Sequence, residues 1–267
     1  MIDKYDRYLE YFSKKCNECK GERRILLNNI WYSCSCQLIA SLKYKFDKIK
    51  IYPNDLKNKT WSDFKGINSS GSKLTAKSLI EAKSQALKYC FNTDDIQAIK
   101  ERKNKSVIPT RLHSGTNVVI SGDSGSGKSL LAFLILKEIV LYSIHATKIM
   151  TFEWIRSSDL LEAARWDNNK QIDNELLDYW TDVQFLFIDN VYLKPNQGDH
   201  RASPNMSSIN RLFYNRLSSR LPTIVLCNDS LLRTDKYDKN KVIEEWGQDF
   251  YNIISDENNF FIQLIKS

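Results

Sequence analysis

Apolar residues in the second half of the chain gather into short continuous runs separated by segments with helical spacing. Apolar runs of about four to eight residues rich in Val, Ile and Phe are typical of buried strands. Such runs occur at 117–121, 148–152, 183–188, 222–227 and 260–264. Apolar residues three and four positions apart predict helices between them, at 157–165, 171–179 and 207–217. Strands that are apolar on both faces and alternate with helices predict an α/β fold, a parallel sheet with helices on both sides.

The first half of the chain is less regular and divides into smaller units. Apolar residues at helical spacing predict a short helix over 1–15 and a longer one over 74–89. A break that contains a proline lies at 51–54. We expect this break to separate a small N-terminal domain, residues 1–52, from a larger domain, residues 53–267.

The most informative motif follows the strand predicted at 117–121. Residues 122–129 read G-x-x-x-x-G-K-S, and an apolar helical segment comes directly after them. Glycines let the backbone N–H groups of such a loop point inward, where they and the N-terminus of the next helix cradle phosphates. A glycine-rich surface turn is the alternative, but it does not need a strand before it and a helix after it. We therefore expect ATP and Mg²⁺ at Gly122, Asp123, Ser124, Gly125, Ser126, Gly127, Lys128, Ser129 and Leu130.

Three polar residues at the ends of later strands are candidate partners of this loop. Asp189 ends an apolar run. This is the position of a Walker B carboxylate, which joins the coordination shell of Mg²⁺ beside Ser129. A core strand that ends at a surface Asp is the alternative. Asn190 follows Asp189. An amide can orient a water molecule but cannot accept its proton at neutral pH. We therefore expect ATP hydrolysis to be slow unless another acid, such as Asp199, substitutes. Asn228 ends the next strand, either to sense the γ-phosphate or to form a turn.

Arginines cluster before the strand predicted at 222–227. They are Arg211, Arg216 and Arg220. An Arg at the end of the preceding helix can reach the nucleotide of a neighbouring subunit, and Arg216 is the candidate for this catalytic role. A solvated basic helix face is the alternative.

Four of the six cysteines lie close together near the N-terminus, at Cys16, Cys19, Cys34 and Cys36. Two Cys pairs at this spacing can fold onto one tetrahedral Zn²⁺, whose binding would supply the folding energy of so small a segment. An iron–sulfur cluster and unligated or redox-active cysteines are the alternatives. Cys90 and Cys227 lie among apolar residues and are expected in the core.

Charge and hydropathy narrow the class of protein. The net charge is +7, and residues 1–66 carry 14 Lys/Arg against 8 Asp/Glu. This excess is a candidate surface for nucleic acid or an acidic protein, or a solvated Lys-rich face. The most apolar segment, 130–141, is too short and too charged to span a bilayer, and no secretory signal is visible. We expect a cytoplasmic location with reduced thiols.

Together these motifs resemble a known family. The run Thr60–Phe64, the loop at 122–129, Asp189 and the segment 216–228 look like the AAA+ ATPases of the DnaC/DnaI helicase-loader type. IstB-like transposition ATPases share this core, and some loaders carry a similar zinc-binding N-terminal module that binds the helicase. The resemblance implies a P-loop NTPase (AAA+) fold over about residues 53–230.

The same resemblance implies a mechanism. ATP would lie between subunits of a homo-oligomer, with Lys128, Ser129 and Asp189 in cis and Arg216 in trans. The oligomer would bind single-stranded DNA and a replicative helicase. Two departures favour slow turnover: Asn190 stands where loaders carry an acid, and no Arg follows Arg233 where a C-terminal sensor Arg is expected. The predicted function is an ATP-dependent helicase loader in DNA replication. A transposition helper, or an ATP-binding adaptor with little hydrolysis, is the alternative.

Overall fold

A computed structural model describes residues 10–11, 13–27, 29–34, 36–37, 40–41, 44, 56, 59–65, 74–90, 115–145, 150–165, 172–192, 205–228 and 239–265. Most of the predicted helix over 1–15, the predicted domain boundary at 51–54 and the alternative acid Asp199 lie outside these residues. The two-domain division therefore stays a prediction.

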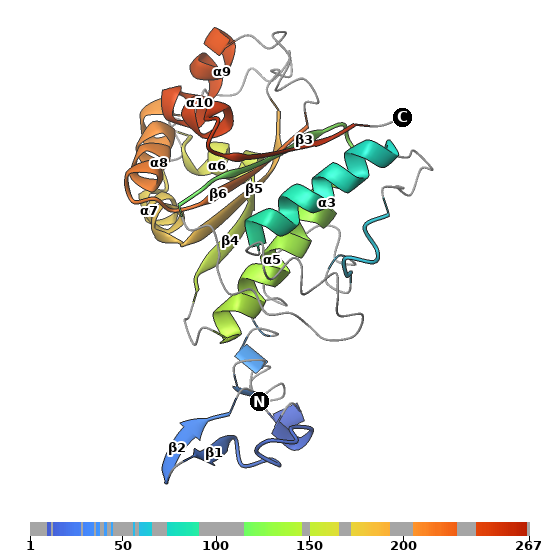
Figure 1. The fold of residues 1–267 in the computed structure, drawn as a ribbon. Helices are drawn as coiled ribbons and strands as arrows, with labels where there is room; N and C mark the ends of the chain where they lie inside the picture. Colours follow the sequence, from blue (N-terminus) through green and yellow to red (C-terminus); the bar gives the residue numbers. More distant parts are fainter. Residues whose placement is uncertain are drawn as a thin grey trace.

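A five-stranded parallel sheet is formed by strands between residues 118 and 264, in the order β4-β5-β6-β3-β7. Figure 1 shows its strands side by side, with β3 between β6 and β7. The strand bounds are β3 Val118–Gly122, β4 Phe152–Arg156, β5 Phe185–Val191, β6 Thr223–Cys227 and β7 Phe260–Leu264. This sheet confirms the predicted fold class, a P-loop parallel sheet flanked by helices.

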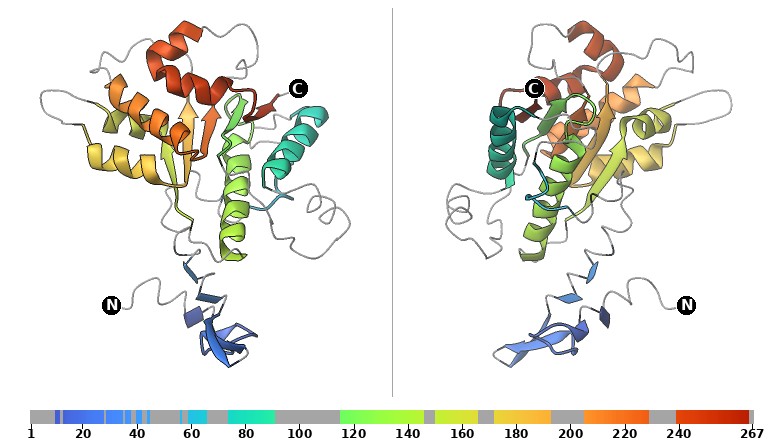
Figure 2. Two further views of the ribbon diagram at one scale, coloured as in Figure 1. Left: turned by 60° about the vertical axis from the view of Figure 1, so that its left-hand side comes forward. Right: turned by 90° about the vertical axis from the view of Figure 1, so that its right-hand side faces the viewer.

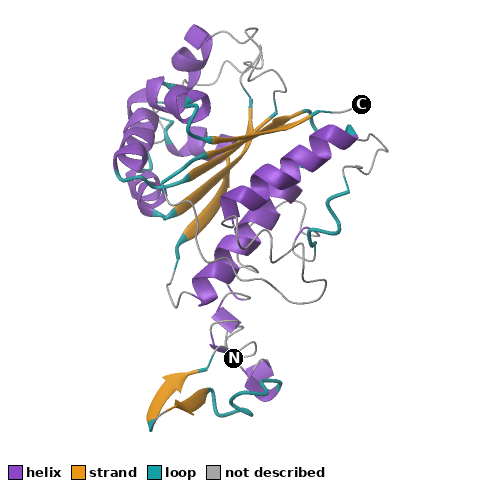
Figure 3. Ribbon diagram, viewed as in Figure 1, coloured by secondary structure: helices purple, strands orange, loops and turns teal. Residues whose placement is uncertain are grey.

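Helices cover both faces of the sheet (Figure 3). Successive strand residues point to opposite sides, so the apolar residues on each side of the strands pack against a layer of helices. Val118 and Ile120 pack with the helices α3 and α5, whereas Val119 packs with the helices on the other face. The first layer consists of α3 Ala76–Cys90 and α5 Lys128–His145. The second consists of α6 Ser157–Ala163, α7 Asn174–Asp182, α8 Met206–Ser218, α9 Lys239–Trp246 and α10 Gln248–Ser255. Figure 2 shows the two layers from the sides.

One predicted strand is displaced along the sequence. The run at 148–152 predicts a strand, but β4 covers Phe152–Arg156, and Met150 and Thr151 precede it without strand structure. The stacked rings of Trp154 and Phe187, with centroids 5.1 Å apart, hold β4 against β5. The prediction of 148–152, of which 148 and 149 lie outside the described residues, was therefore wrong in position, because Glu153 and Arg156 leave this edge strand without a continuous apolar run.

Helices α9 and α10 were not predicted from the sequence. They meet at Gly247, whose φ of 86° allows the sharp change of direction. Trp246 fixes α9 to the end of β5 by donating its indole N–H to the carbonyl of Tyr192 at 3.2 Å. The C-terminal segment therefore covers the sheet rather than trailing from it.

The cysteine-rich segment forms a separate antiparallel hairpin, drawn in blue in Figure 1. Its strands are β1 Arg24–Leu27 and β2 Ile30–Ser33, and they are the two strands between the cysteine pairs.

Among the helices of the described residues, none combines the length and the apolar character needed to cross a membrane.

Arg216 corrects a prediction. Its side chain is 0% exposed, so it is not offered to a neighbouring subunit as an arginine finger. The guanidinium donates to Thr223 Oγ1 at 3.0 Å and to the carbonyls of Trp180, Thr181, Val183 and Pro222 at 2.9, 3.2, 2.7 and 2.6 Å. Burial lowers its pKa. The charge joins the end of α7 to the amino ends of β5 and β6, opposite the edge at which the P-loop lies.

Arg216→Ala should lower the free energy of unfolding by about 3 kcal/mol or more, because it leaves buried carbonyl oxygens without donors. Urea unfolding followed by circular dichroism measures this. Arg211→Ala is the matched control: Arg211 is exposed and paired with Asp178, and its loss should change stability by less than about 0.5 kcal/mol. An Arg216→Ala protein as stable as the native chain would contradict the buried role.

Candidate ATP-binding site and zinc centre

The P-loop begins where β3 ends. Gly122, Gly125 and Gly127 have φ values of 154°, 73° and 97°, in the region that favours glycine. A Cβ on Gly122 would lie 2.7 Å from the carbonyl oxygen of Leu264 in β7, so a larger residue cannot stand there. The loop therefore closes tightly beside the sheet and leads directly into α5 at Lys128.

Lys128 and the start of α5 supply the positive charge of the site. The Lys128 ammonium donates to the carbonyls of Gly122 and Asp123, both at 2.8 Å, and the side chain is buried. The first turn of α5 contains no acidic residue, so the positive end of the helix dipole favours an anion there. This combination fits a nucleotide phosphate chain.

Ser129 and Asp189 are brought together as predicted. The Ser129 hydroxyl donates to Asp189 Oδ2 at 3.1 Å, across 60 residues of sequence. Two neighbouring oxygen ligands of an octahedral Mg²⁺ lie about 3.0 Å apart, given metal–oxygen distances of about 2.1 Å. The pair therefore fits Mg²⁺ as the ion that would carry the phosphates. When bound, that ion would neutralise phosphate charge.

Burial raises the pKa of Asp189, against hydrogen bonds from Asn190 and Ser129 and the charges of Lys128 and Arg156. The charged carboxylate is therefore unfavourable until a cation joins it. A buried acid of this kind is expected at a metal site, although a structural acid can be shifted in the same way.

Asn190 occupies a strained position beside this acid. It lies at an irregularity of the β5–β6 pairing with a φ of 59°, a conformation that Asn tolerates better than most residues. Its N–H donates to Asp189 Oδ1 at 2.7 Å, and its carbonyl accepts from the Ser157 hydroxyl at 2.7 Å. Asn228 Nδ2 donates to Asn190 Oδ1 at 3.4 Å. Two neutral amides therefore stand together at the carboxyl edge of the sheet.

The segment Thr60–Phe64 lies against the P-loop and α5. Phe64 is buried, and a Cβ on Gly127 would lie 3.2 Å from its ring. The Trp61 indole N–H donates to Glu138 in α5 at 2.7 Å, and burial raises the pKa of Glu138. This segment therefore fixes the outer side of the loop.

Arg156 was missed by the sequence analysis. It is the residue of β4 paired with Asp189, and it is exposed at the same sheet edge. The displaced strand prediction concealed it, since a strand at 148–152 ends too early. The signal that could have located the strand end is Asp159, which accepts from the Arg156 N–H at 3.1 Å and marks the start of α6.

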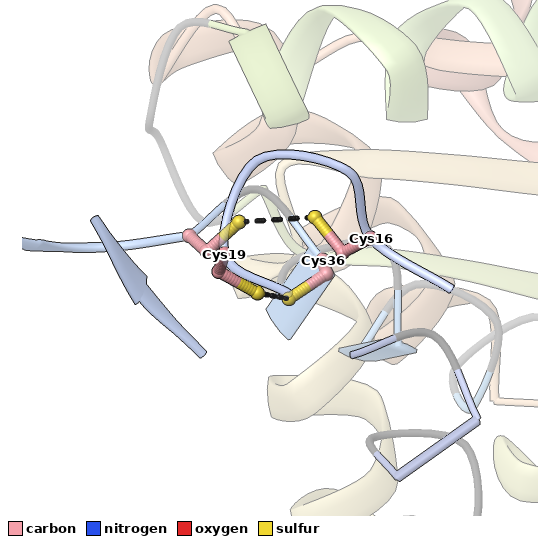
Figure 4. Close-up of side chains that lie close together, drawn as sticks. Cys16, Cys19 and Cys36 are labelled. Atoms are coloured by element: carbon pink, nitrogen blue, oxygen red, sulfur yellow. Dashed lines mark hydrogen bonds between the residues drawn. The ribbon is translucent and has the colours of Figure 1, made fainter. Parts of the chain in front are cut away.

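The four clustered cysteines meet in a second site. Their sulfur atoms lie within 4.8 Å of one another, and Figure 4 shows those of Cys16, Cys19 and Cys36 turned toward a common centre. The Cys16–Cys34 and Cys19–Cys36 sulfur distances are 3.4 and 3.6 Å. Four thiolates 2.3 Å from a tetrahedral Zn²⁺ lie about 3.8 Å apart. The donor set and its spacing fit zinc, and all six cysteines are free of disulfides.

The thiols differ in how readily they ionise. Burial raises the pKa of Cys34 and Cys36. Burial also acts to raise the pKa of Cys19, but hydrogen bonds from the Gly21 backbone and from Cys36 outweigh it and lower that pKa to about 7. A bound cation would favour all four thiolates.

No protein-family profile and no curated protein matches the chain. Among solved structures, the DnaC helicase loader is 17% identical, with a TM-score of 0.47 over 76% of this chain and 98% of that one. DnaI is 16% identical, with a TM-score of 0.45 over 77% of this chain and 94% of that one.

The chain is similar to helicase loaders of the DnaC/DnaI type. AMPPCP-bound DnaA from Aquifex aeolicus is also similar, at 17% identity and a TM-score of 0.39, over 57% of this chain and 42% of that one.

Asp189→Asn should separate metal binding from stability. The folded-state pKa of Asp189 is raised above 3.8, so the stability linked to its protonated form is complete below that pH and is lost as pH rises through the folded pKa. Without nucleotide at pH 7, the neutral variant should melt higher than the native protein, on the order of 2 °C. Thermal unfolding at pH 4 and pH 7 measures this.

Added Mg²⁺ and ATP should raise the Tm of the native protein but not that of Asp189→Asn. Equal stabilisation of both proteins would contradict the metal role of Asp189.

The purified chain should contain about one zinc per molecule by atomic emission. Cys36→Ser should release the metal and unfold the hairpin, while ATP affinity stays within about 2-fold, because different elements form the two sites. Cys90→Ser is the control and should retain zinc, since Cys90 lies in the apolar core that α3 and α5 form with the parallel sheet. A folded hairpin in a metal-free native chain would contradict the assignment.

Proposed function

We propose that the protein is an ATP-dependent loader of a replicative DNA helicase, and that it holds ATP for long periods before turnover. The observation that carries the nucleotide part is the Ser129–Asp189 pair at 3.1 Å beside the closed P-loop. Lys128, Ser129 and Asp189 act in cis in this proposal. Arg216, buried among carbonyls, has no part in it.

Slow turnover follows from the groups around the expected γ-phosphate. Asn190 and Asn228 can hold a water molecule by hydrogen bonds, but neither can take its proton. Arg156 is the described cation nearest in register to Asp189, and it adds charge without adding a base. We infer that ATP binding, rather than its hydrolysis, changes the state of the protein.

The loader part of the proposal rests on the motifs shared with that family and on the attached cysteine module. In this proposal, ATP-bound subunits assemble on single-stranded DNA in the cytoplasm and hold the helicase until nucleotide is released. The adaptor reading is the second candidate, and Asn190 favours it. The adaptor differs from the loader only in that release of the helicase does not need ATP hydrolysis.

Affinity capture from the native host tests the partner. Tagged native protein, with and without a non-hydrolysable ATP analogue, should retain a hexameric helicase more strongly with the analogue. Lys128→Ala is the matched control and should lose this dependence, because its phosphates lack their cation. Recovery of a transposase in place of a helicase would select the transposition-helper function and refute the loader.

Asn190→Asp should raise kcat for ATP at least about 10-fold, because it places a proton acceptor beside Asp189. Asp also tolerates the positive φ of this position. Steady-state phosphate release with saturating ATP measures the gain. Asn190→Gly is the control, since it also fits the backbone but supplies no base, and it should not accelerate hydrolysis. Equal rates for native and Asn190→Asp proteins would show that the missing acid is not what limits turnover.

A further inference from the structure

Ile25 holds one face of the cysteine hairpin against the four cysteines, but Ile30 and Tyr32 on that face are exposed, and the other face is exposed as well. Leu26 pairs with Trp31, and Arg24 pairs with Ser33. Residues two apart on a strand share a face, so these four side chains lie together. Ile25 lies on the opposite face and packs against the cysteines. The Arg24–Leu26–Trp31–Ser33 set is hereafter called the outer hairpin face.

The outer hairpin face holds two exposed apolar side chains beside Arg24 and Ser33. Trp31 is 62% exposed and Leu26 is 51% exposed. Because Leu26 and Trp31 are cross-strand partners, their side chains adjoin, and contiguous exposed apolar surface marks an interaction site where scattered residues do not.

The charge around the hairpin points to a polyanion. Neither strand contains an acidic residue. Arg23 precedes β1, and Arg24 is its first residue. The carbonyl of Arg23 accepts from the Cys34 N–H at 2.9 Å and from Gln37 Nε2 at 2.6 Å, which fastens its backbone to the cysteine cluster. The nearest acid before β1, Glu22, precedes both arginines.

The size of the face distinguishes between kinds of partner. Two paired four-residue strands span about 13 Å by 5 Å. A stable protein interface needs about 800 Å² on each side, which is more than ten times this area. One or two nucleobases need no more than an exposed aromatic ring and adjacent cations.

We propose that the outer hairpin face binds single-stranded DNA, with a base stacked on the Trp31 indole and a backbone phosphate on Arg24. The stacking surface stands on the hairpin geometry alone. The choice of DNA as the strand rests on the proposed function in replication. This contact is distinct from the P-loop and needs no ATP.

Fluorescence anisotropy with labelled oligothymidylate tests the proposal on the full-length, zinc-loaded chain without nucleotide. Trp31→Ala should weaken binding about 10-fold, and Trp31→Phe should restore most of it, because a phenyl ring still stacks. Tyr214→Ala is the matched control: this side chain is 59% exposed on α8, far from the hairpin in sequence, and its loss should leave affinity unchanged.

Arg24→Gln should reduce the slope of log affinity against log salt by about 0.7, the value for one lost phosphate contact on a single strand. Zinc content and ATP affinity of each variant should equal those of the native chain, which excludes unfolding as the cause. Lys128→Ala should bind the oligonucleotide normally here, so a failure of ATP binding is distinguishable from a failure of this proposal.

Unchanged DNA affinity in Trp31→Ala would overturn the proposal. If that variant also sedimented differently from the native chain, the face would join two copies of the protein. If it lost the captured helicase while still binding DNA as tightly as the native chain, the face would dock a protein partner. Both results would refute the assignment to DNA.

Discussion

Burial of β3 between β6 and β7 is the constraint on which the ATP-binding site depends. Its residues are wholly buried, so the strand cannot shift without disrupting both core layers. Its last residue, Gly122, lies so close to the Leu264 carbonyl that no side chain fits there, and the chain turns directly after it. The turn places the P-loop and the start of α5 at the carboxyl edge of the sheet, where β5 delivers Asp189. The order of the strands therefore brings the P-loop and the metal ligand Asp189 together.

The two edges of the sheet use charge in opposite ways. At the amino edge, Arg216 is completely enclosed and its donors are matched by carbonyl and hydroxyl oxygens. That charge is structural. At the carboxyl edge, Asp189 is buried with few partners and its pKa is raised. An unfavourable carboxylate of this kind can gain from a cation, which links the instability of the empty site to its affinity for Mg²⁺.

Much of the fold could be predicted from the sequence, and the failures have physical causes. The β3 and β7 strands are short apolar runs with clear ends, and β7 lies where 260–264 predicted it. The α9–α10 pair was missed although Val242, Trp246 and Phe250 repeat every four residues, because Gly247 interrupts the pattern. The displaced β4 hid Arg156.

The site could be predicted in part for a similar reason. Short motifs carry their own chemistry, so the P-loop, Ser129 with Asp189 and the four cysteines were found and are brought together. Whether an arginine lies in solvent or among carbonyls depends on the tertiary packing around it. The role of Arg216 therefore could not be read from its neighbours in sequence.

The central claim is that this site retains ATP rather than consuming it. The direct measurement loads the native protein with radiolabelled ATP and Mg²⁺, removes free nucleotide, and follows the ratio of bound ATP to ADP over time. The account predicts that most bound nucleotide remains ATP after many minutes. Conversion to ADP within about a second, near the typical enzyme turnover of about 10 per second, or no retained nucleotide at all, would contradict it.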